Sequence, residues 1–118
     1  MARSAILIAV IVLVLGGLFF LLRPDTPSGV PRERTIAVSI EGGEMSPAEI
    51  SVNEGDSVTL RVSSDLPMEL HLHGYDVEGE VGPGQKTTLR FVADLTGRFE
   101  IEDHASEQEL GVLQVRPR

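Results

Sequence analysis

The chain of 118 residues contains no cysteine. Disulfide bonds, thiolate metal ligands and cysteine nucleophiles are therefore excluded, and so is a lipid anchor on an N-terminal cysteine. The same absence says nothing about the redox state of the compartment, because there is no thiol to be oxidised or kept reduced. Any chemistry must come from other side chains, which include only three histidines.

Basic residues are scarce outside the N-terminal segment. Without residues 1–23, the chain has 8 basic and 18 acidic residues, a formal charge of −10. Such a surface repels phosphates, so no nucleic-acid partner is expected. It suits solubility, attraction of cations or a basic protein partner.

Two kinds of catalytic motif are also missing. The sequence has no nucleophile with a base at a recognisable spacing and no phosphate-binding glycine loop. On this ground we expect the protein not to be an enzyme.

The chain has one long apolar run, AILIAVIVLVLGGLFFLL at residues 5–22. As a helix it would span roughly 27 Å, close to the hydrocarbon thickness of a bilayer. The alternative is a cleaved signal peptide, whose apolar stretch is about 7–15 residues long and precedes a small-residue cleavage site. Here LFFLLRP follows Gly16 and Gly17 instead. We therefore predict a single transmembrane anchor over residues 1–23.

The rest of the chain divides into a linker and one domain. Residues 24–34 hold three prolines, a glycine and several charges, which predicts an extended tether. Residues 35–118 alternate apolar and polar positions in about seven short runs separated by glycine-rich turns. This period predicts an antiparallel β-sandwich or barrel with no helix outside the membrane segment.

Several fragments of the domain recur in an order known from one family. They are MSPAEISVNEGDSVTLRVSSD at residues 45–65, VGPGQKTTLRFVAD at 81–94, GRFEIEDH at 97–104 and LGVLQV at 110–115. Together they make residues 35–117 resemble the cupredoxins, the small copper proteins that include plastocyanin-like domains and subunit II of cytochrome oxidase. The resemblance implies a Greek-key β-sandwich.

The stretch HGYD at residues 73–76 narrows the resemblance. It is similar to a group of exported bacterial proteins of that family. The likeness implies a domain on the periplasmic or extracellular side of the cell membrane. Charge does not support this orientation, because Arg3 precedes the span whereas Arg23, Arg32 and Arg34 follow it.

The copper site of the family is not complete in this chain. A blue copper centre needs a cysteine thiolate, two histidines and usually a methionine. Around the closing loop the chain has Glu102, Asp103 and His104, with Leu110 before Gly111, and His71 lies two or three residues past the place of the first family histidine. Blue-copper electron transfer is therefore rejected, and only His104 corresponds to a family ligand.

The histidines themselves suggest a different metal site. In a strand, His71 and His73 share one face, and Glu102 and His104 share a face on a second strand. These four residues could supply three imidazoles and a carboxylate to a copper ion, or to zinc. The expected function is a membrane-anchored, metal-binding domain with a non-blue site for metal handling. The alternative is a metal-free structural or protein-interaction module whose histidines lie on a solvent-exposed face.

Overall fold

The computed structural model describes residues 1–23 and 29–118, and in these ranges it contains one helix and nine strands. The helix, α1 (Ala2–Leu21), includes an apolar segment, Ser4–Leu21, with a mean hydropathy of 2.9 and no buried surface. Its length and composition suit a membrane span, and a signal sequence has the same features. Residues 24–28 of the predicted linker lie outside the described residues.

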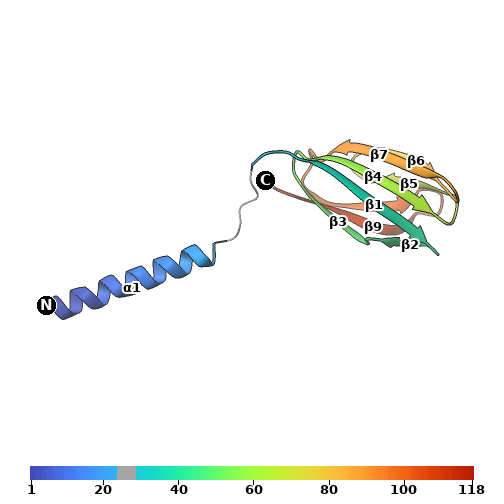
Figure 1. The fold of residues 1–118 in the computed structure, drawn as a ribbon. Coiled ribbons are helices and arrows are strands. Elements are labelled where there is room, and N and C mark those ends of the chain that lie inside the picture. Colours follow the sequence, from blue (N-terminus) through green and yellow to red (C-terminus); the bar gives the residue numbers. More distant parts are fainter. Residues whose placement is uncertain (24–28) are drawn as a thin grey trace.

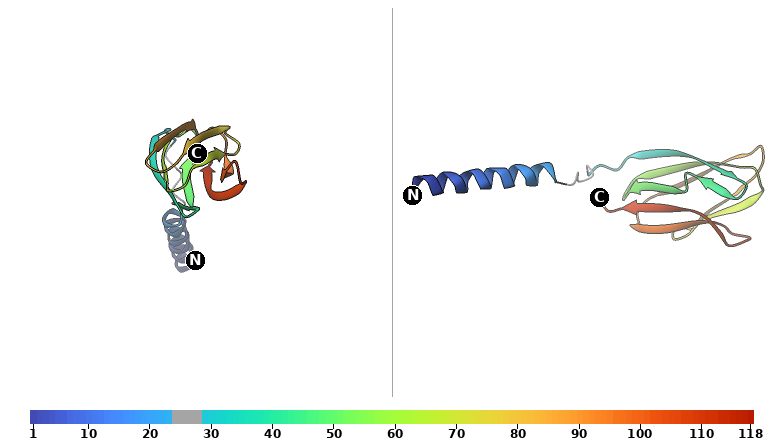
Figure 2. Two further views of the ribbon diagram at one scale, coloured as in Figure 1. Left: turned by 90° about the vertical axis from the view of Figure 1, so that its right-hand side faces the viewer. Right: turned by 90° about the horizontal axis from the view of Figure 1, so that it is seen from below.

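The strands form two sheets packed face to face (Figures 1 and 2). The four-stranded sheet has the order β2-β1-β4-β7 and the five-stranded sheet the order β3-β9-β8-β5-β6. Their bounds are β1 (Glu33–Glu41), β2 (Glu44–Ser46), β3 (Glu49–Asn53), β4 (Ser57–Ser64), β5 (Met68–Leu72), β6 (Val77–Val81), β7 (Lys86–Val92), β8 (Gly97–Asp103) and β9 (Gln108–Arg116). The predicted β-sandwich is confirmed.

Three details of the prediction need correction. Strand β1 begins at Glu33, so the last two residues of the predicted linker, 33 and 34, belong to the domain. Strands β2 and β6 were not among the predicted runs. The sandwich is not purely antiparallel, because β1 pairs with β4 and β3 pairs with β9 in parallel. Parallel neighbours need a long connection. Here the chain between β1 and β4 contains β2 and β3, and the chain between β3 and β9 contains β4 to β8.

The core lies between the sheets and follows the predicted alternation. Along β4 the buried and exposed positions alternate, and in β5 Leu70 and Leu72 are buried while His71 between them faces outward. Most apolar members of the core are aliphatic: Val38, Ile40, Met45, Ile50, Val52, Val58, Leu60, Val62, Leu70, Leu72, Val81, Leu89, Ala93, Ile101, Leu113 and Val115. Each strand therefore presents polar side chains on the outer face of its sheet.

One carboxylate is fully buried at an end of the sandwich. Asp56 has no exposed surface, and its side chain accepts hydrogen bonds from the backbone N–H groups of Arg32 (2.9 Å) and Asn53 (3.1 Å) and pairs with the guanidinium of Arg118. Burial alone would raise the pKa of Asp56, but these donors and the positive charge lower it below 3.8. The pair is therefore ionised in the folded protein.

The C-terminal residue extends this network. Arg118 also donates to the backbone carbonyls of Glu54 (2.8 Å) and Val30 (2.7 Å). A planar guanidinium can satisfy several acceptors at once, which suits a buried position. Arg118 thus joins the β3–β4 turn, the chain leading into β1 and the end of β9.

Candidate metal centre

Strand pairing places two of the predicted ligands directly opposite each other. In the antiparallel pair of β5 and β8, His71 lies across from Glu102, Leu70 across from Asp103 and Leu72 across from Ile101. Opposite residues point to the same side of a sheet. His71 and Glu102 therefore share the outer face, while Leu72 and Ile101 share the core.

His73 joins them from just beyond the end of β5. Its backbone N–H donates to the carbonyl of Glu100 (3.0 Å), which keeps it against β8. Its Nε2 forms a hydrogen bond with Oε1 of Glu102, and Nδ1 of His71 lies 3.6 Å from the same oxygen. One ligand atom from each of His71, His73 and Glu102 lies within 4.8 Å of the other two. Two imidazoles and a carboxylate thus converge on one point.

Of the two imidazoles in this group, that of His71 is the less exposed to solvent. Its side chain is 16% exposed, against 46% for His73. Within the part of the chain that the structure describes, the buried Nδ1 of His71 has no hydrogen-bond partner. A buried nitrogen without a partner is costly unless it binds something, and a metal ion satisfies the same lone pair.

His104 lies next to this group but is not part of it. Its ring packs edge-on against the ring of His71, with centroids 5.4 Å apart, and its backbone N–H donates to the carbonyl of Glu69 (2.8 Å). Of the four predicted ligands, the structure brings His71, His73 and Glu102 together and leaves His104 beside them.

The hydrogen bond between His73 and Glu102 changes the proton affinity of both groups. It raises the pKa of His73 above 6.5, against the opposing effect of partial burial, and it lowers the pKa of Glu102 below 4.5. Both shifts favour an imidazolium–carboxylate pair. Protons therefore compete with a metal ion for His73 more strongly than for a free imidazole.

A register shift between β8 and β9 lies beside Glu102, and it leaves one extra residue, Leu110, in β9. The register between β8 and β9 shifts between Ile101, which pairs with Gly111, and Glu102, which pairs with Glu109. Bulges twist a strand locally and re-aim side chains. No feature of the sequence alternation reveals this shift.

An aromatic cluster fixes the turn that follows the histidines. The hydroxyl of Tyr75 donates to the carbonyl of Leu95 (2.6 Å), and its ring packs against Phe91 and Phe99. Gly74 has φ +83°, and a Cβ there would lie 2.6 Å from the ring of Phe99. Only glycine fits this turn, which supports Tyr75 as a packing residue and not as a ligand.

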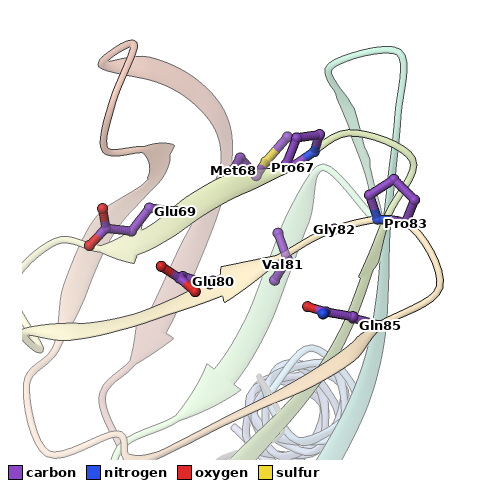
Figure 3. A pocket seen from close by; sticks show the side chains of 8 residues that line it. All are labelled: Pro67, Met68, Glu69, Glu80, Val81, Gly82, Pro83 and Gln85. Carbon is purple, nitrogen blue, oxygen red and sulfur yellow. The ribbon is translucent and has the colours of Figure 1, made fainter.

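Further carboxylates surround the centre on the outer face of the sheet. Glu78 lies across from His71, and Glu80 lies across from Glu69. Figure 3 shows Glu69 and Glu80 on the neighbouring strands β5 and β6, beside a hollow whose other lining residues are Pro67, Met68, Val81, Gly82, Pro83 and Gln85. Like charges directly opposite each other are unfavourable, so a cation near them lowers the electrostatic energy of this face.

The sequence matches a known family over residues 9–115, under the description "Cupredoxin-like domain". Among curated proteins it is similar to Laccase abr2 of Aspergillus fumigatus, with 30% identity over 112 residues, 79% of this chain and 18% of the laccase. The chain thus spans less than a fifth of the length of that relative.

Solved structures share the fold at low sequence identity. One chain of a heme-copper terminal oxidase dimer has a TM-score of 0.61 and 16% identity, with 98% of this chain and 100% of that chain covered. A blue copper oxidase from Nitrosomonas europaea has a TM-score of 0.58 and 23% identity, covering 73% and 39%. A copper binding protein solved in its apo form has a TM-score of 0.61 and 12% identity, covering 74% and 98%.

These comparisons correct the expectation that the protein is not an enzyme. The curated relative is a laccase, and similar folds occur in oxidases. That expectation rested on missing nucleophiles and phosphate loops. It was wrong because an oxidase that works through copper needs neither, since the metal supplies the reactivity and its ligands come from separate strands.

Proposed function

The chain belongs to the cupredoxin-like domain family, and from this premise we propose that it is a membrane-anchored domain that binds copper outside the cytoplasmic membrane, for copper handling. Residues 1–23 are the anchor, the segment up to residue 32 is the tether, and the sandwich from β1 onward carries the site. The observation that carries this proposal is the convergence of His71, His73 and Glu102 within 4.8 Å. His104 is the proposed fourth ligand.

The donor set fits copper(II). Imidazole nitrogen and carboxylate oxygen suit copper(II), and the affinity order of divalent metals places copper above zinc at such a site. Both imidazoles must be neutral to bind, so loading releases the proton that His73 shares with Glu102. Bound copper(II) is expected to be pale, because the intense blue band needs a thiolate and the chain has no cysteine.

One observation favours a second function. The hydrogen bond with Glu102 gives the His73 ring nitrogen a partner without a metal. This is expected of a protein-interaction module that has the fold but binds no metal. Metal titration separates the two functions.

The first prediction concerns metal-induced stability. For the full chain in detergent, purified without a histidine tag, free copper(II) at about 100 times its Kd should raise the free energy of unfolding by roughly 2.7 kcal/mol. This corresponds to a melting temperature several degrees higher. His71→Ala should remove most of the increase, because it deletes the most enclosed ligand.

Glu78→Gln is the matched control for this titration. Glu78 is an exposed carboxylate across from His71 but outside the converging group, so its substitution should leave most of the increase. If neither copper nor zinc changes the melting temperature of the wild-type chain at neutral pH, the metal-binding proposal is wrong and the interaction module takes its place.

The second prediction concerns pH. Because the pKa of His73 is raised above 6.5, copper affinity should begin to fall on acidification before pH 6.5 is reached and should keep falling toward about pH 5. Glu102→Gln removes the carboxylate that raises this pKa, so the fall should start at lower pH, from a weaker plateau. Kd values measured between about pH 5 and 8 check this, and equal affinities across that range would contradict it.

A further inference from the structure

The turn between β8 and β9 is built around one carboxylate. Asp103 is the last residue of β8, and its side chain accepts hydrogen bonds from the hydroxyl of Ser106 (2.7 Å) and from the backbone N–H of Ala105 (3.4 Å). An aspartate that binds donors two and three residues ahead of it closes the chain into a turn. His104 lies inside this turn, so Asp103 fixes the backbone on both sides of His104.

The same carboxylate holds the turn against β5. Asp103 lies across from Leu70 in the pairing of β5 with β8, and the backbone N–H of the next residue donates to the carbonyl of Glu69 (2.8 Å). The pKa of Asp103 lies below 3.8, chiefly because the Ser106 hydroxyl outweighs the effect of burial, and the backbone N–H of Glu69 is a further cause. The carboxylate is therefore ionised and has donors on both the turn and β5.

The ring of His104 is kept beside the metal-binding group by this arrangement. Its centroid lies 5.4 Å from that of His71, and the centroids of His71 and His73 are 4.7 Å apart. In the described part of the chain the side chain of His104 is exposed and has no hydrogen-bond or ion-pair partner. Apart from the ring contact with His71, the place of this ring depends on its backbone, and Asp103 fixes that backbone.

We propose that Asp103 is a positioning residue of the metal centre, which holds His104 where it serves as the fourth ligand. This inference rests on the proposed function. A ligand already held close to the ion loses less conformational freedom on binding than one on a mobile turn, so metal affinity rises. Asp103 is not itself a ligand, because its oxygens are engaged with Ser106 and Ala105 and it lies outside the converging group.

The test begins with copper(II) affinities of the full chain in detergent, purified without a histidine tag. Asp103→Ala removes the acceptor, and we expect a loss of about 10–100-fold, as for other residues that orient metal ligands. Ser106→Ala removes one donor but keeps the charge, so its loss should be smaller. Glu107→Gln is the matched control. It removes an exposed carboxylate of the same turn, and the Kd should stay nearly unchanged.

A double-mutant cycle separates positioning from a general effect of charge or folding. Because Asp103 acts through His104, Asp103→Ala should cost almost nothing in the His104→Ala background. His104→Ala alone should weaken copper binding at least as much as Asp103→Ala does. A loss from Asp103→Ala that is equally large in both backgrounds overturns the proposal.

Electron paramagnetic resonance of bound copper(II) gives a readout that a purely structural role does not move. We expect coupling to three imidazole nitrogens in the wild-type chain and to two in both Asp103→Ala and His104→Ala. The same number of coupled nitrogens in wild type and Asp103→Ala overturns the proposal. If thermal unfolding shows that Asp103→Ala is not folded, Ser106→Ala carries the cycle and the spectroscopic comparison in its place.

The outcomes also separate this inference from the proposed function. An unchanged Kd for His104→Ala overturns the positioning role of Asp103 and the fourth-ligand assignment, while binding through the three converging residues stands. Absence of copper binding by the wild-type chain overturns the proposed function, and this inference with it.

Discussion

Asp56→Ala is expected to lower the free energy of unfolding by about 3–5 kcal/mol, because it breaks a buried ion pair by removing one partner. Asp56 has no exposed surface, and the side chain of Arg118 is only 11% exposed, so water cannot replace the lost carboxylate. The backbone N–H groups of Arg32 and Asn53 lose their acceptor as well. At about 4–8 °C for each kcal/mol, the melting temperature should fall by roughly 12 °C or more.

The control for this variant is a surface ion pair. Glu49→Ala removes the partner of Arg98, but both side chains are more than half exposed, so the cost should stay within about 1 kcal/mol. A similar cost for the two variants would contradict the assigned role of Asp56. Denaturant unfolding at neutral pH measures both.

The same pair contributes to acid sensitivity. Because the pKa of Asp56 is lowered in the folded state, its stabilisation is present above about pH 4 and is lost as pH falls through the native pKa. The difference in stability between wild type and Asp56→Ala should therefore shrink in strong acid. A difference that stays constant down to about pH 2 would contradict this assignment.

Leu72→Ala is expected to cost about 2–5 kcal/mol in the free energy of unfolding without changing the metal-induced increment. Leu72 is 1% exposed and packs in the core between the sheets, so truncation leaves a cavity. Its neighbours His71 and His73 lie on the outer side of the chain. Thermal unfolding with and without copper(II) measures both quantities in one experiment.

His73→Ala should show the reverse pattern. Its side chain is 46% exposed, so the metal-free protein should lose little of its free energy of unfolding, whereas most of the copper-induced increment should disappear. If Leu72→Ala removes as much of the increment as His73→Ala does, the separation of core and metal-binding functions along this strand is wrong.

The alternation of apolar residues predicted most of the sandwich, because it reports which side of a strand faces the core. It could not reveal β6, whose only apolar side chains are Val77 and Val81 at its ends. Its central Gly79 leaves room for Leu89 of β7, and a Cβ there would lie 2.7 Å from that side chain. Nor does alternation say which strands are neighbours, so the parallel pairs of β1 with β4 and of β3 with β9 were not foreseen.

The alternation of strand residues between the two faces of a sheet also predicted part of the candidate site. It placed His71 and Glu102 on outer faces, and the pairing of β5 with β8 then sets them opposite each other. It was less informative for His104, which lies past the end of β8, where the extended conformation that carries the two-residue period ends. Asp56 and Arg118 are 62 residues apart in the sequence, and no local sequence pattern predicts a contact between residues so far apart.

A force applied through the residues that precede β1 would act along that strand. The carbonyl of Val30 accepts a hydrogen bond from Arg118, which pairs with Asp56, so such a force would load this network before it reaches β1. Because β1 lies parallel to β4 over eight residue pairs, that force shears the whole ladder at once and does not unzip it bond by bond. Separating β1 from the domain in this direction would therefore require these hydrogen bonds to break together.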